Sequence, residues 1–448
     1  MKKVLLISYH FYPDTSIGAR RPTEFVKSLH GAGYSIDVLT LNRELSNSVD
    51  FVDRFYSINE YPDPINLVSK AIKKISKVFK KNKQEGILKV KKTFNQLSKA
   101  EKEVWQTMPE SFFLKARRYI LSFQASLSAK KIWILLGIIK LVCIRLKRKR
   151  YNIVITSSPP IAVNVLGLVA QRLFKAKWIL DLRDPVIQWE DIYPECISAG
   201  RVKLEERFEG LYLGRSDLIL VTTPSYKSEL DSKCILKDFN KEIVLLLNGY
   251  DSQIKNKNID IKRKSDVLNI IYAGSLYMNR DPFPFLLAIK NLIIKDIRKI
   301  SVNFFGSCSS WKGIDMKKWL ELNEISSYVT IHGTVDSDLL DEIYQDADIL
   351  LVFAQGQPKQ IPAKVFEYLP YSAPILCVSE KDADTTKLLS GIVSAYVVES
   401  DEKKIQKIIL SIQKKELSEN NIDEIKFFSR VSQNKLLIKE CDRFSRVN

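Results

Sequence analysis

The 448-residue sequence has little of what metal-binding and disulfide-stabilised proteins use. Its three histidines are scattered, and its six cysteines lie far apart without a Cys-x-x-Cys pair: Cys143, Cys196, Cys234, Cys308, Cys377 and Cys441. Structural zinc needs clustered ligands, and a disulfide framework is typical of short secreted chains with regularly spaced cysteines. We therefore expect neither.

Long apolar runs are also absent. The longest, at residues 132–139, is interrupted by Lys140. Even when it is extended to residue 146, it is shorter than the roughly 20 apolar residues of a membrane-spanning helix. The N-terminal residues 1–8 contain only four strongly apolar positions before Tyr9, so we interpret them as a buried strand and not as a secretion signal. These features predict a cytoplasmic protein without a transmembrane segment.

The first β-α-β unit has no glycine-rich dinucleotide fingerprint. Apolar periodicity predicts a strand at residues 4–8, a loop at 9–18, a helix from about 20 to 30 and a strand at 35–40. Gly18 stands alone in this loop, where a nicotinamide or flavin site would have Gly-x-Gly-x-x-Gly. The pattern predicts a doubly wound parallel sheet without such a cofactor.

The alternation of short apolar strands with helices continues in two series. The expected strands after the opening unit lie at residues 153–156, 178–182, 218–222 and 243–247, and then at 268–272, 302–305, 329–332, 349–353, 375–378 and 395–398. A lysine-rich linker separates the two series, and one core of this length would exceed the usual domain size. We expect two α/β domains, at residues 1–255 and 262–425, and a C-terminal helix at 426–448 that packs back on the first domain.

Positive charge is concentrated in an insertion at about residues 65–150 of the first domain. Residues 70–150 contain 23 lysines and arginines but only 4 acidic residues, an excess that alone accounts for the +18 of the chain. Four apolar residues here fall on one stripe of a helix surrounded by lysines: Val68, Ile72, Ile75 and Phe79. Such a helix favours an anionic membrane surface. A merely solvated basic helix and a nucleic-acid site are the alternatives, although the aromatic residues of a stacking platform are missing.

Residues 360–378 carry the strongest functional signal. The pattern predicts a loop, a short helix with Pro362 in its first turn, and a strand, so that the first amides of the helix point out of the end of a sheet and attract phosphate. Glu367 could accept hydrogen bonds from two ribose hydroxyls, while Lys364, one turn earlier on the same face, could meet the phosphates. An ordinary surface helix with a Lys–Glu pair is the alternative.

Six motifs occur in the order seen in a known family: Tyr12-Pro13 with Gly18, and then residues 181–185, 248–251, 272–276, 332–335 and 364–374. Together they resemble the retaining nucleotide-sugar glycosyltransferases of family 4. The resemblance covers nearly the whole chain except residues 55–150. It implies the GT-B fold, in which two Rossmann-like doubly wound parallel-sheet domains face a central cleft.

The resemblance also implies a function. Relatives that share the Phe-Tyr-Pro opening and the Leu-Arg-Asp-Pro turn tend to build bacterial surface polysaccharides. The expected activity is retaining transfer of a hexosyl group from a nucleoside-diphosphate sugar to a lipid-linked saccharide, in capsule, exopolysaccharide or lipopolysaccharide synthesis. The enzyme would be held peripherally at the inner face of the cell membrane through the anionic-surface contact of residues 70–150, with no nucleic-acid partner.

Roles follow position by position from the same resemblance. The expected catalytic residues are Arg183 and Asp184, near the acceptor and the reacting sugar carbon, and Arg280, which neutralises the leaving diphosphate. A structural ion pair is the alternative for Arg183 and Asp184. The expected donor-binding residues, with Gly18 at the donor phosphate and Glu367 at the ribose, are Gly18, Gly274, Ser275, Lys359, Gln360, Ile361, Lys364 and Glu367.

Two residues depart from the family pattern. Ser275 stands where the family has an arginine, and Lys359 stands at the first glutamate of its Glu-x7-Glu pair. A lysine there could bind a charged sugar, such as a uronic or sialic acid. Fixed cations and helix amides can stabilise a departing diphosphate without a metal, and no obvious Asp-x-Asp loop precedes the donor site, so we expect neither a metal nor another cofactor.

Three other classes of function stay open. A GT-B nucleotide-sugar epimerase would share the donor pocket but would need no acceptor. A non-catalytic or weakly active GT-B partner of a polysaccharide assembly complex would keep the fold with a weakened site, as Ser275 and Lys359 allow. A nucleic-acid binder would use the basic insertion.

Overall fold

The computed structural model describes residues 2–43, 49–61, 130–185, 199–251, 267–277, 279–294, 299–414 and 422–446. The chain divides into two compact units. The first unit comprises Met1–Asp14, Ser35–Asp181 and Pro185–Asp217, and the second comprises Thr15–Tyr34, Leu182–Asp184 and Leu218–Asn448. Most of the basic insertion, including residues 70–118, lies outside the described residues.

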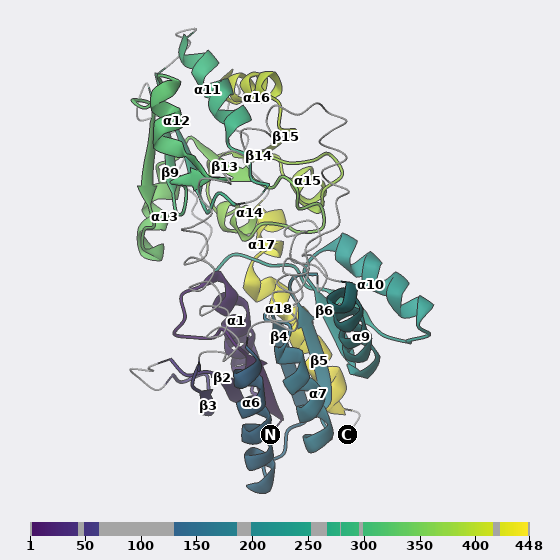
Figure 1. Ribbon diagram of the computed structural model, residues 1–448. Coiled ribbons are helices and arrows are strands. Elements are labelled where there is room, and N and C mark those ends of the chain that lie inside the picture. Colours follow the sequence, from purple (N-terminus) through teal and green to yellow (C-terminus); the bar gives the residue numbers. More distant parts are fainter. Residues whose placement is uncertain are drawn as a thin grey trace, which may run out of the picture. The chain divides into compact units, whose positions relative to one another are not determined.

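The first sheet has seven strands in the order β3-β2-β1-β4-β5-β6-β7 (Figure 1). Their bounds are β1 Lys3–Ser8, β2 Ser35–Leu41, β3 Arg54–Ile58, β4 Ile153–Ser158, β5 Lys177–Leu182, β6 Leu218–Val221 and β7 Ile243–Leu245. The helices along this part of the chain are α1 Ile17–Gly31, α6 Lys131–Leu146, α7 Val163–Phe174, α9 Ala199–Arg215 and α10 Pro224–Leu236. Strand β1 pairs in parallel with β2 and β4, which is the reversal of strand order that defines a doubly wound sheet.

The second sheet has six parallel strands in the order β12-β9-β8-β13-β14-β15. Their bounds are β8 Val267–Ala273, β9 Lys299–Phe305, β12 Val329–Gly333, β13 Ile349–Phe353, β14 Ile375–Val378 and β15 Ala395–Val398, and a short antiparallel ribbon joins β10 Ser310–Trp311 to β11 Ile314–Asp315. The helices are α11 Phe283–Ile294, α12 Met316–Leu322, α13 Ser337–Gln345, α14 Ala363–Tyr368, α15 Asp384–Leu389, α16 Glu402–Lys414, α17 Ile422–Phe427 and α18 Arg430–Arg446. The two parallel sheets confirm the α/β class, and every strand expected from the sequence forms.

Hydrophobic cores lie on both faces of the second sheet. Helices α11 and α16 pack side by side on one face, where Leu286, Ile289 and Ile409 are fully buried (Figure 1). The other face is covered by α14, whose Val365 and Phe366 are buried. Because each strand is buried on both faces, the strand sequences are continuous apolar runs such as 349–353. Such runs are recognisable in the sequence alone.

Several local predictions need correction. Helix α1 begins at Ile17, so Gly18 lies in its first turn and not in the preceding loop. Pro362 precedes α14 and has an extended backbone, so the helix begins one residue later than expected. Strand β3 was missed because it is an edge strand, and only its last residue, Ile58, is buried, so its sequence is not an apolar run.

The Asn248-Gly249-Tyr250-Asp251 motif is held by the C-terminal segment. The Tyr250 N–H donates to the Phe428 carbonyl at 3.2 Å, and the Arg430 N–H donates to the Tyr250 carbonyl at 3.0 Å. A Cβ at position 249 would lie 2.5 Å from the Phe428 oxygen, so only glycine permits this approach. Helix α18 then packs against α1, where the Asn434 side chain donates to the Glu24 carbonyl at 3.1 Å.

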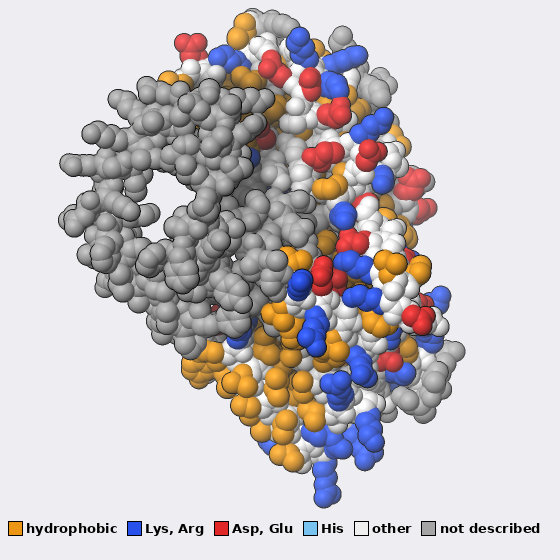
Figure 2. All heavy atoms as spheres, turned by 45° about the vertical axis from the view of Figure 1, so that its right-hand side comes forward, with side chains coloured by type: hydrophobic (Ala, Val, Ile, Leu, Met, Phe, Trp, Pro, Cys, Tyr) orange, Lys and Arg blue, Asp and Glu red, His pale blue; other side chains and the backbone are white. Residues whose placement is uncertain are grey.

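Helix α6 is apolar on all sides, including the side that faces solvent. Trp133, Leu141 and Ile144 are buried, and α6 packs beside α7 in the first unit. Four other apolar residues of α6 are exposed: Leu135, Ile139, Val142 and Leu146. Figure 2 shows hydrophobic side chains gathered beside lysines and arginines in the lower half of its view, at the height of α6 and α7 in Figure 1. No helix among the described residues is both long and apolar enough to cross a bilayer.

Candidate functional site

The candidate site lies at the carboxyl ends of β8 and β13 in the second unit. These two strands are neighbours, and the strand order reverses between them, from β8 outward to β9 and β12 on one side and from β13 to β15 on the other. In open parallel sheets, ligands bind beyond the carboxyl ends of the strands at such a reversal. The loop after β8 carries Gly274, Ser275 and Arg280, and the loop after β13 leads to Lys359 and α14.

Arg280 is the least satisfied charged group of this loop pair. Its two terminal nitrogens make only long contacts, at 3.4 Å to the Ser275 carbonyl and 3.5 Å to Gln357 Oε1. Its Nε is buried without any hydrogen-bond partner, and its guanidinium lies 4.3 Å from the centre of the Tyr277 ring. Among the described residues Arg280 has no carboxylate partner. A guanidinium carries five N–H donors, so Arg280 retains capacity for an anion.

Two further buried polar atoms after strands of the same sheet lack partners. They are Oε1 of Gln355, just after β13, and Oγ of Ser379, just after β14. The Gln355 amide nitrogen donates to the Asp281 carbonyl at 3.0 Å, which fixes the direction of its oxygen. Native proteins satisfy most buried polar atoms, so several unsatisfied ones at one sheet edge indicate a ligand site.

The backbone after β8 is held tightly against β9. The Gly274 N–H donates to the Phe305 carbonyl at 2.9 Å, and the Cys308 thiol donates to the Gly274 carbonyl at 3.3 Å. Gly306 has a φ of +110°, and a Cβ there would lie 2.2 Å from the Gly274 oxygen. Burial raises the pKa of Cys308 to about 12, so the thiol stays protonated and remains a donor. Both polar backbone atoms of Gly274 are therefore used within the fold.

Glu367 sits between two cations. Its Oε1 accepts from Arg20 of α1 at 3.0 Å, and its Oε2 accepts from Lys364 at 2.6 Å. Lys364 also donates to the Tyr344 hydroxyl at 2.8 Å. The side chains are largely buried, with exposed fractions of 28% for Arg20, 17% for Lys364 and 12% for Glu367. The Lys–Glu pair considered as the ordinary alternative does form, but as part of a mostly buried triad and not on an open surface.

Lys359 is directed away from this triad. Its Nζ lies 2.6 Å from Oε2 of Glu229 on α10, and its side chain is 53% exposed. The Lys359 carbonyl accepts from the Thr223 hydroxyl at 2.8 Å. Burial opposes ionisation of Glu229, but hydrogen bonds from Lys359 and Lys233 outweigh it, and the pKa of Glu229 is lowered. The ion pair thus joins α10 to the loop before α14.

The remaining predicted residues meet one another in the second unit. Arg183 donates to the Gly18 carbonyl at 2.6 Å, and Gln360 donates to Oδ1 of Asp184 at 2.9 Å. The Gly18 oxygen is therefore already engaged by a cation. Ile361 points into the hydrophobic core that contains Val365 and Phe366, so only its backbone can face a ligand.

The structure therefore groups the predicted residues into two clusters, one on the loop after β8 and one drawn from α1, the residues after β5, the loop after β13 and α14. One contains Gly274, Ser275 and Arg280; the other contains Gly18, Arg183, Asp184, Lys359, Gln360, Lys364 and Glu367. Gln357 links the two, since it lies in the loop after β13 and meets Arg280. No group of three or more potential metal-ligating His, Cys, Asp or Glu side chains occurs in the described part of the chain.

Sequence reasoning missed four residues that shape this site: Arg20, Glu229, Tyr344 and Gln357. Three of them reach it from other helices, α1, α10 and α13, and no spacing rule connects them with α14. Gln357 could have been predicted from the sequence, because it lies two residues before Lys359, in the loop that leads to the donor-binding residues.

Comparisons with known proteins show the fold. No protein-family model and no curated protein sequence matches this chain. Sucrose-phosphate synthase from Thermosynechococcus elongatus is similar in structure, with a TM-score of 0.60 and 12% identity over 100% of both chains. A trehalose-6-phosphate synthase, studied for glycosyl transfer with retention, has a TM-score of 0.60 and 12% identity over 98% of this chain and 99% of its own. HepE from Anabaena in complex with UDP-glucose has a TM-score of 0.50 and 10% identity over 100% of this chain and 99% of its own. These likenesses confirm the GT-B fold class expected from the sequence.

Proposed function

We propose that this protein is a retaining glycosyltransferase that moves a hexosyl group from a nucleoside-diphosphate sugar to a lipid-linked saccharide in bacterial surface-polysaccharide synthesis. The observation that carries the proposal is Arg280, a partly buried arginine with spare donors where the strand order of the second sheet reverses. The similar structures include one that binds UDP-glucose and one studied for transfer with retention, which supports this chemistry.

Arg280 and Lys364 would both stabilise the negative charge of the departing diphosphate. In the transition state of glycosyl transfer, negative charge develops on the departing nucleoside diphosphate, and fixed cations stabilise it because they need no reorganisation. Arg280 offers its unpaired Nε and two weakly used terminal nitrogens. Lys364 is a point charge held in place by Glu367 and Tyr344.

Glu367 fits the ribose. An ionised carboxylate has about four lone-pair positions, and Glu367 uses one on each oxygen for Arg20 and Lys364. Two positions therefore remain for a pair of vicinal hydroxyls. The hydrogen bonds from the two cations fix the orientation of the carboxylate, so the donor's nucleoside would meet a preorganised acceptor.

Arg183 and Asp184 would serve the acceptor side. The Arg183 side chain is tied to the Gly18 carbonyl, and Asp184 receives a hydrogen bond from Gln360 of the donor loop. Asp184 thus couples the proposed acceptor side to the loop that leads into α14. Same-face attack by the acceptor hydroxyl needs this alignment of acceptor and donor.

Nucleotide binding tests the proposal. Thermal unfolding would be followed with a panel of nucleoside diphosphates, because a ligand that binds the native state stabilises it by about 2.7 kcal/mol at one hundred times its dissociation constant. We expect one nucleotide to raise the Tm of the wild type and not that of the Arg280→Gln variant. If no nucleoside diphosphate changes the Tm, the proposal is wrong.

Product analysis then separates the two enzymatic alternatives. The donor that matches the best nucleotide is incubated with the protein alone and with a lipid-linked saccharide. A transferase forms product only when the acceptor is present, whereas an epimerase converts the donor alone into an isomer. Nucleotide binding without either reaction would favour a non-catalytic partner.

The exposed face of α6 supports a peripheral membrane contact. Leu135, Ile139, Val142 and Leu146 recur along one side of the helix, and Lys147 and Arg148 follow it directly. Apolar side chains beside basic ones are the pattern that binds anionic bilayer surfaces. Because surface electrostatics are screened by salt, binding to anionic vesicles should weaken as the salt concentration rises.

A pair of variants tests this contact. Replacing both Leu135 and Ile139 by serine should reduce co-sedimentation with phosphatidylglycerol vesicles. Replacing Ile235 and Leu236 by serine should not, because these two exposed residues belong to α10. Equal binding of both variants would contradict a role of α6.

A further inference from the structure

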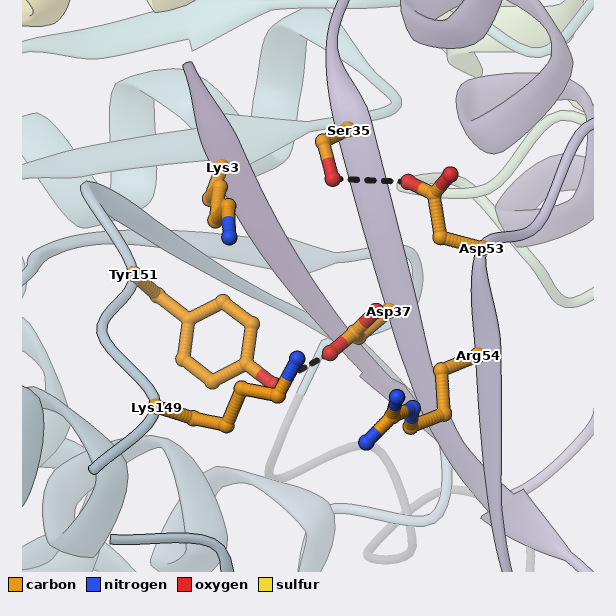
Figure 3. A pocket seen from close by; sticks show the side chains of 7 residues that line it. All are labelled: Lys3, Ser35, Asp37, Asp53, Arg54, Lys149 and Tyr151. Atoms are coloured by element: carbon orange, nitrogen blue, oxygen red, sulfur yellow. Dashed lines mark hydrogen bonds between the residues drawn. The ribbon is translucent and has the colours of Figure 1, made fainter. Parts of the chain in front are cut away.

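A pocket lies at the amino ends of β1, β2 and β3 in the first unit, and none of its lining residues belongs to the donor loops. Lys3, Ser35 and Arg54 are the first residues of these three strands, and the pocket has a volume of about 140 Å³. The rest of the lining consists of Asp37, Asp53, Lys149 and Tyr151 (Figure 3). All seven residues belong to the first unit, whereas the candidate donor site lies in the second.

Neutral groups satisfy the two carboxylates of this pocket. Oδ2 of Asp37 accepts from the Tyr151 hydroxyl at 2.6 Å and from the Tyr56 hydroxyl at 3.3 Å. Oδ2 of Asp53 accepts from the Ser35 hydroxyl at 2.7 Å and from the Ile36 N–H at 2.6 Å. Burial and the hydrogen bond to Asp37 raise the pKa of Tyr151, so this donor keeps its proton. In both carboxylates, Oδ1 has no hydrogen-bond donor among the described residues.

The three cations, in contrast, have no partner. Within the described chain, the side-chain nitrogens of Lys3, Arg54 and Lys149 make no hydrogen bond or ion pair. Figure 3 shows all three pointing toward the same space beside Asp37, from β1, from β3 and from the segment before β4. Like charges that converge repel one another, and an anion placed between them relieves the repulsion.

The pocket therefore offers two kinds of contact to a single ligand. Three cations with free N–H donors suit a phosphate group, for which arginine provides a planar fork and lysine a point charge. The two free carboxylate oxygens accept hydrogen bonds but cannot donate them, so they suit hydroxyl groups. A bare inorganic anion would use only the first set, whereas a phosphate ester of a sugar or polyol would use both.

We propose that this pocket binds a small phosphate ester that carries hydroxyl groups, either as a free metabolite or as the headgroup of an anionic phospholipid. The binding site is separate from the donor site, so it does not depend on the function proposed above. Glycerol 3-phosphate is the probe, because it is a minimal hydroxyl-bearing phosphate ester and also matches part of the phosphatidylglycerol headgroup.

Calorimetric titration of the full chain with glycerol 3-phosphate tests the proposal. Loss of two charge-assisted contacts in the double variant Arg54→Gln/Lys149→Gln should weaken binding about tenfold or more. Arg172→Gln is the matched control, because Arg172 is an exposed arginine of α7 in the same unit. It should bind as the wild type does. Both variants should keep the wild-type Tm in the absence of ligand, because none of the three side chains makes a hydrogen bond or ion pair with the described residues.

Further arms identify the site and the source of the ligand. The Arg280→Gln variant should bind glycerol 3-phosphate as the wild type does, and the pocket variant should bind nucleoside diphosphate as the wild type does. Competition by phosphatidylglycerol vesicles supports the headgroup as source, and lack of competition supports a free ester. The proposal is overturned if the wild type does not bind the probe, if the pocket variant binds it equally well, or if only Arg280→Gln loses it.

Discussion

Arg280 and Arg20 lie in the same unit, and both belong to the candidate site, yet their surroundings are opposite. Arg280 has long contacts to neutral oxygens and a buried Nε without a partner. Arg20 has a carboxylate partner, Glu367, which also holds Lys364. One cation is left available, while the other is neutralised within the protein.

From this difference we infer a ligand-binding role for Arg280 and a structural role for Arg20. A buried donor without a partner costs free energy, and the fold retains it only where something else, such as a ligand, supplies the acceptor. A charge that is paired within the protein contributes to shape and orientation, and removing its partner is costly. We therefore expect substitutions at the Arg280 cluster to affect function and substitutions in the Glu367 triad to affect stability as well.

The largest effect is expected at Arg280. Replacing it by glutamine should lower kcat by about 10²–10³-fold, as does the removal of one preorganised donor from a developing negative charge. The Tm should hardly change, because the lost contacts are long and to neutral groups. Steady-state kinetics with the best donor, next to the Arg172→Gln control, measure this effect. Normal turnover of Arg280→Gln would contradict the functional role that separates Arg280 from Arg20.

The same contrast explains which parts of the fold and of the site could be predicted from the sequence. The buried strands of both sheets and the loop of Arg280 were predictable, because buried parallel strands are continuous apolar runs and functional loops follow them directly. The edge strand β3 has no such run and was missed. The triad was only half predictable. Lys364 and Glu367 are three residues apart on a helix, whereas Arg20 arrives from a helix nearly 350 residues away in the chain.

The orientation of Lys359 was beyond prediction for the same reason. Its departure from the family pattern is plain in the sequence, and a contact with a charged sugar was a reasonable expectation. Its partner Glu229, however, lies on α10 and is joined to the loop only by the tertiary fold. The pocket at Lys3, Arg54 and Lys149 was missed because these residues occur at the starts of separate strands, or before one, with no local pattern.

An intermediate effect is expected at Glu367. Replacement by glutamine removes the charge that neutralises two largely buried cations, so the free energy of unfolding should fall by about 2 kcal/mol, below the 3–5 kcal/mol typical of a fully buried pair. Urea denaturation measures it. The matched control is Glu399→Gln, which breaks an exposed pair with Lys404 and should leave the midpoint unchanged. If Glu367→Gln is as stable as the wild type, the triad is not a structural element.

The smallest effect is expected at Lys359. The pKa of Glu229 is lowered in the folded state, so its ion pairs stabilise the protein above the ordinary glutamate pKa of about 4.3, and this contribution is lost as the pH falls through the lowered value. Lys359→Gln should therefore reduce the free energy of unfolding by less than about 1 kcal/mol at pH 7, because Lys359 is half exposed. The difference from the wild type should therefore shrink as the pH falls below the ordinary glutamate pKa.

Urea denaturation between about pH 3 and pH 7 measures this pH dependence. Lys387→Gln is the control, since Lys387 is an exposed lysine of α15 without an ion pair in the described residues. The same variants decide whether Lys359 also selects the donor. An ion pair that only joins α10 to the donor loop leaves the preference between neutral and acidic sugars unchanged in Lys359→Gln. A shift toward neutral donors would mean that the ion pair between Lys359 and Glu229 opens when the donor binds. Lys359 would then contact the donor directly, as we propose for Arg280.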